Sequence, residues 1–338
     1  MQKPATVKDV AKLAGVSTAT VSRVLSGAAN VSGELAERVR KVVWELRYQP
    51  NQLARNLRVQ ETRTVGVIIP DIGSSFHTTV IAGIEEVLLD AGYSMLLGHA
   101  NNDPARERQI LASLRGENVA GLIFASAGKL EEDYRRLAEG GVALVAVSRV
   151  PESLEVDSVS MTDRQGAREA VQHLLKLGHR RIALLNGATE VSTGRERLAG
   201  FEEAFSAAGV DAPRDLVRQT GWKQVAAYQA MRSLLAMRQP PTAVFCGANL
   251  ITLGALQAIH ESSLQIPKEV AVVGYDDTGW AASLRPALTT VAQPAREAGI
   301  RSARLLLEKL DQPDTPVRRV VLETKLVVRG SCGWQWKW

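Results

Sequence analysis

The sequence predicts an N-terminal all-α helix-turn-helix headpiece followed by a larger α/β domain with two lobes. Three observations lead to this prediction. A basic excess is confined to the first 60 residues, three short amphipathic helical patterns occupy the same segment, and short apolar runs alternate with helical patterns from residue 62 onward. The first two features describe a small helical domain, and the third describes parallel sheets covered by helices.

The charge of the chain is distributed unevenly. Residues 1–60 contain ten Lys or Arg against four Asp or Glu, whereas the remaining 278 residues contain 31 basic and 32 acidic side chains. Such a basic segment suggests a polyanionic partner, although a solvated basic face explains the charge alone equally well. The spacing of the residues in this segment must therefore decide between a polyanionic partner and a solvated basic face.

The first two predicted helices are short and joined by a tight turn. Thr6 and Asp9 have the spacing of a capping box, Gly15 ends the first helix, and Ser17 is placed to cap the second. The residues expected to face inward from these two helices are Val7, Val10, Leu13, Ala14, Val21, Val24 and Leu25. A third helix opening at Ser32 supplies the apolar surface that completes a minimal core.

In a helix-turn-helix motif the second helix lies in the major groove of DNA. Its outward residues here are Thr18, Ala19, Ser22 and Arg23. Arg23 is expected to read guanine, and the small Thr18 and Ala19 are expected to contact a thymine methyl or a base edge. Thr6 and Ser17 are candidates for phosphate contacts. Helical triplets also occur as plain bundles, but together with the charge asymmetry this pattern favours DNA.

Pro50 breaks the third helix, and residues 51–58 form a short potential helix with too little apolar surface to fold alone. At this point residues 6–26 (TVKDVAKLAGVSTATVSRVLS) and 48–57 (YQPNQLARNL) together resemble the LacI/GalR family of repressors. The resemblance implies a dimer on a palindromic operator and a hinge helix that drives Leu57 into the minor groove as a wedge. The hinge residues assigned to DNA in this way are Asn51, Ala54, Arg55 and Leu57.

Beyond residue 62 the expected strands are 64–69, 94–97, 121–124, 142–147, 182–185, 243–246 and 270–274. An internal repeat accompanies them, because residues 81–93 (IAGIEEVLLDAGY) recur as residues 198–210 (LAGFEEAFSAAGV). We interpret the two copies as corresponding helices of two similarly wound lobes, with a ligand cleft between them.

Ligands of open α/β sheets bind beyond the carboxyl ends of the strands, so polar residues in those loops are the candidate site. Arginine, carboxylate, amide and aromatic groups together suit a polyhydroxylated or acidic ligand. Any one of them alone is more simply a cap, an ion pair or a core residue, and only their convergence favours a site. The candidates are Ser74, Ser75, Phe76, Arg149, Arg197, Trp222, Asn249 and Asp276.

The family resemblance continues through residues 177–183, 197–201, 273–277, 288–291 and 326–330. It implies a periplasmic-binding-protein-like sensor domain in which Arg197 and Asp276 are the principal contacts to a sugar-like effector. Leu250, Ser148 and the pair Thr162–Asp163 depart from the residues usual in the family, which leaves the effector's identity open. The implied domains are 1–47 for DNA binding, 48–61 for the hinge, 62–333 for effector binding and 334–338 as a tail. Within 62–333 the N-lobe takes about 62–161 and 292–323, and the C-lobe about 162–291 and 324–333.

Two alternatives remain, a solute-binding protein without DNA function and a sugar-modifying enzyme. The phosphate-loop, dinucleotide-binding, zinc-protease and nucleophile-elbow motifs are missing from the sequence. We therefore expect no catalytic residues, no cofactor and no metal. The two cysteines and the lack of an apolar targeting segment suggest a cytoplasmic protein without a membrane partner.

Overall fold

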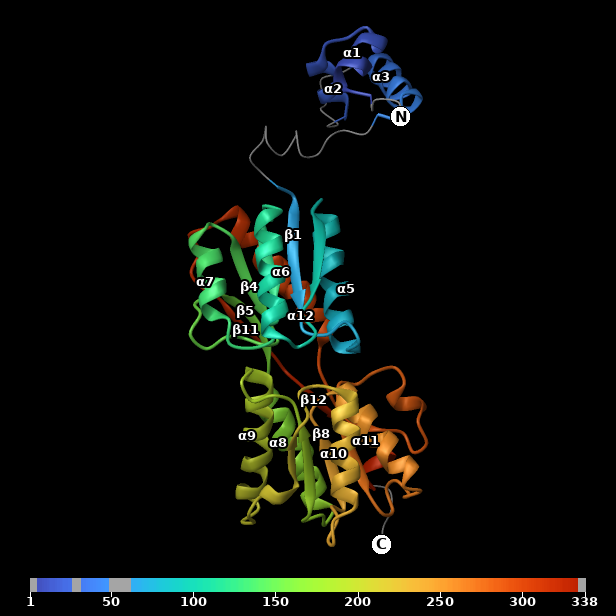
Figure 1. Ribbon diagram of the computed structural model, residues 1–338, viewed down its shortest axis with the longest axis vertical. Coiled ribbons are helices and arrows are strands. Elements are labelled where there is room, and N and C mark those ends of the chain that lie inside the picture. The colour runs from blue at the N-terminus through green and yellow to red at the C-terminus, as the bar shows by residue number, and fades with distance from the viewer. Residues whose placement is uncertain (1–4, 26–31, 49–61, 334–338) are drawn as a thin grey trace. The chain divides into compact units, whose positions relative to one another are not determined.

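The computed structural model describes residues 5–25, 32–48 and 62–333, which fall into two compact units, Met1–Thr62 and Arg63–Trp338. The first unit, which we call the headpiece, contains helices α1 (Val7–Ala14), α2 (Thr18–Leu25) and α3 (Gly33–Glu45). The second unit, which we call the body, contains two sheets (Figure 1). Both parts of the predicted fold class are thereby confirmed.

The headpiece helices begin and end where local chemistry directs them. The Asp9 carboxylate accepts from the Thr6 backbone N–H at 2.8 Å while the Thr6 hydroxyl accepts from the Asp9 N–H at 3.4 Å, which completes the capping box. Gly15 ends α1 with a left-handed φ of 63°. The Ser17 hydroxyl accepts from the Thr20 N–H at 3.1 Å and so caps α2. These capping predictions are confirmed.

One predicted core residue of the headpiece is wrong. Leu13 is 63% exposed, and α1 instead buries Val10, Ala11 and Ala14 against α2 and α3. Successive residues of a helix are rotated by about 100°, so Leu13 lies one such step from Ala14 at the margin of the buried stripe. In a helix of only two turns that stripe is narrow, and Leu13 falls outside it.

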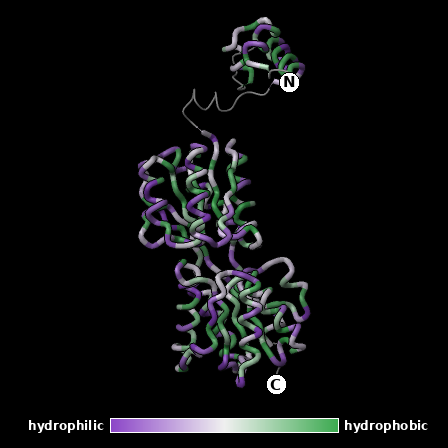
Figure 2. The backbone as a smooth tube through the Cα atoms, in the orientation of Figure 1, coloured by the Kyte–Doolittle hydropathy of each residue, from purple (hydrophilic) through white to green (hydrophobic). Residues whose placement is uncertain are grey.

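Each lobe of the body has a six-stranded sheet with helices on both faces (Figures 1 and 2). The N-lobe sheet has the order β11-β5-β4-β3-β1-β2 and the C-lobe sheet the order β12-β10-β9-β8-β6-β7. All pairings are parallel except that of β10 with β12. The N-lobe strands are β1 (Thr64–Ile69), β2 (Ser94–His99), β3 (Gly121–Phe124), β4 (Ala143–Val147), β5 (Asp157–Met161) and β11 (Arg319–Leu322). The C-lobe strands are β6 (Ile182–Asn186), β7 (Val217–Gln219), β8 (Ala243–Cys246), β9 (Ala271–Tyr275), β10 (Thr289–Ala292) and β12 (Lys325–Val327).

Apolar clusters lie on both faces of each sheet, and the strands that they enclose are hydrophobic along most of their length (Figure 2). The chain passes between the sheets after β5, between β10 and α12, and between β11 and β12. The helices of the body are α5 (Ser75–Asp90), α6 (Pro104–Gly116), α7 (Glu131–Glu139), α8 (Asp163–Lys176), α9 (Ser192–Ala207), α10 (Gln224–Leu235), α11 (Asn249–Glu261) and α12 (Ala295–Asp311), with short 3₁₀ turns at Arg214–Leu216, Ala281–Ser283 and Gly330–Cys332.

The internal repeat has a packing explanation. Gly83 of α5 and Gly200 of α9 occupy corresponding places in its two copies. A Cβ at Gly83 would lie 2.3 Å from the Arg296 carbonyl oxygen of α12, and one at Gly200 would lie 2.1 Å from the Arg164 carbonyl oxygen of α8. Glycine therefore permits a close helix crossing in each lobe.

Within the described residues, no helix has both the length and the apolar character that crossing a membrane requires.

Candidate functional site: the cavity between the lobes

A cavity lies between the strand-end loops of the two lobes, the place where ligands of open α/β sheets bind. Polar and aromatic side chains from both sheets form its wall. The residues that line it are Asp71, Ser74, Phe76, His77, Asn102, Ser148, Arg149, Thr193, Arg197, Trp222, Ala248, Asn249, Leu250, Asp276 and Gln293.

Hydrogen bonds and an ion pair join the lobes on opposite sides of the cavity. The Asn249 amide donates to the hydroxyls of Ser74 at 3.2 Å and Ser75 at 3.0 Å. Elsewhere the Val150 N–H donates to the Ser192 hydroxyl at 3.1 Å, and Arg195 forms an ion pair with Glu152. These contacts hold the lobes together around the cavity.

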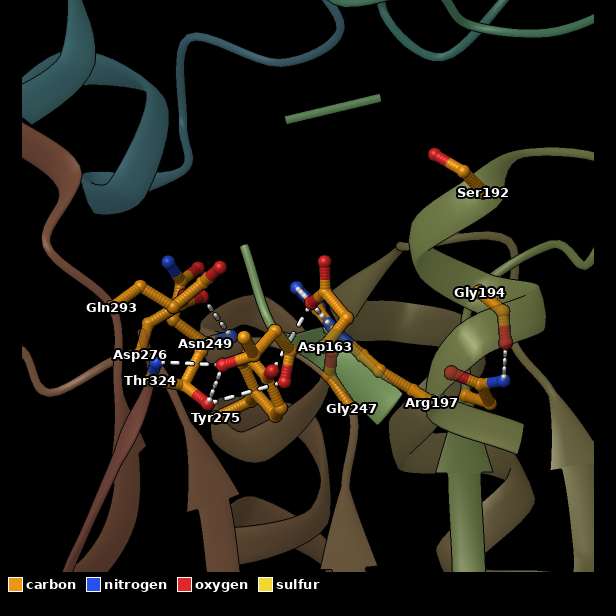
Figure 3. Close-up of polar contacts among 12 residues, drawn as sticks. Asp163, Ser192, Gly194, Arg197, Gly247, Asn249, Tyr275, Asp276, Gln293 and Thr324 are labelled. Atoms are coloured by element: carbon orange, nitrogen blue, oxygen red, sulfur yellow. Dashed lines mark hydrogen bonds and ion pairs between the residues drawn. The ribbon is translucent and has the colours of Figure 1, made fainter. Parts of the chain in front are cut away.

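Arg197 anchors the C-lobe wall. Its guanidinium donates from Nε at 2.8 Å and from Nη2 at 2.6 Å to one oxygen of Asp163, and Nη1 donates to the Gly247 carbonyl (Figure 3). Burial disfavours the charged guanidinium, but the adjacent Asp163 carboxylate outweighs this and raises the pKa of Arg197. Tyr275 lies beneath the guanidinium and donates to the same Asp163 oxygen at 3.0 Å. Arg197 is thus fully charged and fixed in position.

Asp276 follows β9 in a left-handed conformation, with φ of 71°. Its carboxylate accepts from the Asn249 N–H at 3.1 Å and from the Gln293 amide. Burial raises the pKa of Asp276, while the charge of Arg197 opposes the rise. The backbone strain of a non-glycine residue in this region aims the carboxylate into the cavity wall (Figure 3). The adjacent Asp277 is bound to Arg329 instead, so the two carboxylates do not act as a pair.

Trp222 is the aromatic face of the cavity, and it too has a positive φ, 66°. Its indole lies over Gly187, where a Cβ would come within 2.0 Å of the ring. The guanidinium of Arg149 lies over the indole at 4.7 Å from the ring centroid. The sequence around Gly187 therefore makes room for the ring, and the ring in turn contacts an arginine from the other lobe.

Arg149 extends from the N-lobe loop after β4 and is 4% exposed. Its guanidinium donates to the Ser126 carbonyl at 3.3 Å and to the Asn102 side-chain oxygen at 3.0 Å. Burial, and next the charge of Arg197, lower the pKa of Arg149 to about 9. Burial, followed by the charge of Arg149, lowers the pKa of the neighbouring His77 to about 3, so this imidazole is neutral.

Many polar atoms of the cavity wall lack a hydrogen-bond partner. These buried atoms are His77 Nδ1, Asn102 Nδ2, Thr193 Oγ1, Trp222 Nε1 and Gln293 Oε1. An unsatisfied buried polar group is costly, and a site awaiting a polar ligand accounts for several of them at once. Donors and acceptors above an aromatic face suit a small polyhydroxylated molecule.

The structure brings the predicted effector residues together. Seven of the eight line the cavity, and Ser75 contacts it through Asn249. Sequence reasoning missed Asp71, His77, Asn102, Thr193 and Gln293 as lining residues. His77 follows Phe76 directly, and Thr193 lies in the first turn of α9 two residues before Arg195, so extending the strand-end argument by a residue or two would have found both. Asn102 and Gln293 carry no comparable local signal.

The predicted DNA-binding residues divide into three groups. Thr18, Ala19, Ser22 and Arg23 form the exposed side of α2. The hydroxyls of Thr6 and Ser17 are used as helix caps, although both side chains are also exposed. Asn51, Ala54, Arg55 and Leu57 lie outside the described residues, as does the tail at 334–338. In the described parts of the chain no cluster of three or more His, Cys, Asp or Glu is arranged to hold a metal.

Comparison with known proteins agrees with both units. Residues 6–51 match the bacterial regulatory proteins of the lacI family, and residues 171–332 match the periplasmic binding protein-like domain. The ribose operon repressor of Haemophilus influenzae is 33% identical, over 97% of this chain and 98% of its own. The transcriptional repressor PurR of Klebsiella pneumoniae is 32% identical, over 97% of this chain and 96% of its own.

Solved structures extend the comparison. The lac repressor dimer bound to operator and an anti-inducer is 29% identical, covers 98% of this chain and 99% of its own, and superposes with a TM-score of 0.85. The regulator CelR in complex with cellobiose is 33% identical, covers 97% of this chain and 99% of its own, and superposes with a TM-score of 0.74. The chain therefore belongs to the lacI family of bacterial regulatory proteins and is a transcriptional repressor with a ligand-binding domain, not an enzyme.

Proposed function

We propose that the protein binds a palindromic operator as a homodimer and that a small sugar-like effector in the inter-lobe cavity sets its affinity for DNA. In this proposal residues 1–47 read the operator, residues 48–61 form the hinge, and residues 62–333 bind the effector and the second subunit. The protein acts in the cytoplasm, where its DNA lies.

The observation that carries the proposal is the cavity itself. Both lobes contribute to its wall, so a ligand inside contacts two bodies whose separation can change. The related CelR structure holds cellobiose, and a lacI-family regulator from Enterococcus faecium, 28% identical and covering 79% of this chain and 98% of its own with a TM-score of 0.72, holds ribose. The unpartnered polar atoms of the cavity wall provide donors and acceptors for such a ligand.

The DNA-binding half of the proposal rests on α2. Its exposed side carries small residues and Arg23, which allow close approach to base edges and a bidentate contact to guanine. The related lac repressor was solved as a dimer on its operator. Two-fold symmetry of the protein predicts two-fold symmetry of the operator.

Effector and operator must influence one another reciprocally. A ligand shifts the lobes only through different affinities for their two arrangements, so the factor by which it changes operator affinity equals the factor by which operator changes ligand affinity. In this proposal the cross-lobe contacts of Asn249 and Ser192 form in the closed arrangement and are lost in the open one. Leu57 is proposed to transmit the change as a minor-groove wedge. Leu57→Ala should then weaken specific binding more than non-specific binding, and equal losses would contradict the wedge.

The test is selection of full-length protein on a random duplex pool, followed by binding measurements on the selected sequence. Wild-type protein should enrich a palindrome, and Arg23→Ala should lose one base preference symmetrically in both half-sites. Arg38→Ala is the matched control, because Arg38 is an equally charged, exposed residue of α3. It should change affinity without changing the selected sequence. Failure of wild-type protein to prefer any duplex would refute the proposal.

A further inference from the structure

The charges of the cavity wall are not evenly matched. Each carboxylate that takes part in the wall's hydrogen bonding already has a partner. Asp163 is bound to Arg197 and Tyr275, and Asp276 to Asn249 and Gln293. Asp71, at the rim, accepts from the Gly73 N–H. Among the described residues, none of these carboxylates forms an ion pair with the guanidinium of Arg149, although Asp71 acts on it at longer range.

Arg149 has neutral partners only. Within the described residues it forms no ion pair, and its contacts are the Ser126 carbonyl, the Asn102 side-chain oxygen and the face of Trp222. A buried arginine is ordinarily matched by a carboxylate, because removal of a charge from water is costly unless it is paired. Burial, and next the like charge of Arg197, lower the pKa of Arg149, and the carboxylates of Glu107 and Asp71, which form no ion pair with it, offset this only in part.

The atoms beside Arg149 are also donors. Since a guanidinium can only donate, the oxygen of Asn102 must face it, which directs the Asn102 Nδ2 amide elsewhere, and this amide has no acceptor. The buried Nε1–H of Trp222, whose ring lies against Arg149, has no acceptor either. Three donor groups in contact with one another therefore belong to the cavity wall. The same wall holds the acceptors Asp276 and Gln293 Oε1, which suit hydroxyl groups.

We propose that the effector is an anionic polyhydroxylated molecule, such as a sugar acid or sugar phosphate, whose anionic group is bound by Arg149 together with Asn102 and Trp222. This rests on the proposed function and narrows its ligand class. Carboxylate and phosphate both match a guanidinium with two parallel hydrogen bonds, so the shared chemistry is the anion. Leu250, an apolar residue of the wall, adds no negative charge to oppose it.

The test is calorimetric titration of the full-length protein with three matched pairs of probes. These are glucose with gluconate, glucose with glucose 6-phosphate, and ribose with ribose 5-phosphate. We expect one anion to bind about 10-fold to 100-fold more tightly than its neutral partner, the range of a charge-assisted hydrogen bond. The gluconate and phosphate arms distinguish the two sources of negative charge.

Arg149→Gln is the decisive variant, because it keeps an amide donor and removes the charge. It should abolish the preference for the anion, because it weakens binding of the anion by about 10-fold to 100-fold more than it weakens binding of the neutral sugar. Arg195→Gln is the control, since Arg195 is paired with Glu152 outside the cavity wall, and it should keep the preference. Thermal unfolding of both variants verifies that they are folded.

The inference is overturned if no anion binds more tightly than its neutral partner, or if Arg149→Gln weakens both partners equally. Operator binding, measured in parallel, separates this outcome from failure of the proposed function. If a neutral sugar binds best and alters operator affinity, the anionic effector is refuted and the proposed function stands. If an anion binds best without any change in operator affinity, the anion site stands and the proposed regulation by the effector is refuted.

Discussion

Replacement of Asp163 by asparagine should destabilise the body more than any comparable surface change. The side chains of Asp163 and Arg197 are 5% and 4% exposed, so both charges are withdrawn from water. The asparagine would preserve the volume and one acceptor but leave the buried guanidinium of Arg197 without the carboxylate that it contacts, so that only Asp276, which is not hydrogen-bonded to it, would remain as a counter-charge. The remaining contacts of that guanidinium, the Gly247 carbonyl and the Tyr275 ring, are neutral.

Breaking a buried pair by removing one partner costs about 3–5 kcal/mol. For a domain of the size of the body, this corresponds to a decrease in Tm of roughly 6–20 °C. Urea denaturation followed by circular dichroism measures the loss in unfolding free energy. The matched control is Glu297→Gln, which breaks the exposed pair with Arg301 and should cost less than about 1 kcal/mol.

The double variant Asp163→Leu/Arg197→Met completes the experiment. Replacing both partners by apolar side chains removes the unpaired charge, so this variant should be more stable than Asp163→Asn alone. Its ligand affinity should nevertheless be lost, because the arginine that lines the cavity is gone. A loss below about 1 kcal/mol for Asp163→Asn, or a double variant less stable than the single one, would refute the charge-pair reasoning.

Three further predictions concern the cavity. His77 has a pKa of about 3 in the fold against about 6.5 in the unfolded chain, so the unfolded chain binds the proton first and the free energy of unfolding falls as pH drops below 6.5. His77→Gln should remove this pH dependence, a slope of about 1.4 kcal/mol per pH unit. Urea denaturation at pH 7, 6 and 5 measures the slope, and an unchanged slope would contradict the prediction. Gly187→Ala should expel Trp222 and change its fluorescence, whereas Gly116→Ala, with open space around its Cβ, should not; identical spectra would show that the ring adapts in place. Ser192→Ala removes the acceptor of the Val150 N–H and should enlarge the radius of gyration measured by small-angle X-ray scattering, and no change would count against a role in closure.

Most of the strands that the sequence predicts are buried on both faces, and the partly exposed β2 is the exception. β1, β3 and β8 are apolar along their length and were expected at the residues where they occur. The missed strands β7, β11 and β12 have three or four residues and are partly exposed, so they lack a continuous apolar run. β10 was missed although it is buried, because it is short and begins with two threonines. β5 was missed because it is polar. Its buried Asp157 is paired with Arg318, a partner 161 residues away that no local pattern reveals.

The candidate site shows the same division. Residues that follow a predicted strand were found because parallel strands end at one edge of a sheet, and this holds for Arg149 and Asp276. Asn102 and Gln293 join the cavity through contacts with residues distant in sequence, namely Arg149 and Asp276. The error at Leu13 has a related cause, since the periodicity of a two-turn helix defines a broad face and only the packing partners choose its centre.

The two lobes contribute to the cavity in different ways, and this difference bears on how a ligand acts. In the C-lobe the charge of Arg197 is matched by Asp163, which it contacts, and by the nearby Asp276, so that wall supplies its own counter-charges. The N-lobe supplies Arg149, whose charge has no carboxylate in contact. An anion held against the C-lobe wall would supply that counter-charge only when the N-lobe closes over it. The free energy of the added pairing would then favour the closed arrangement alone, which is the differential affinity that a ligand needs in order to change operator binding.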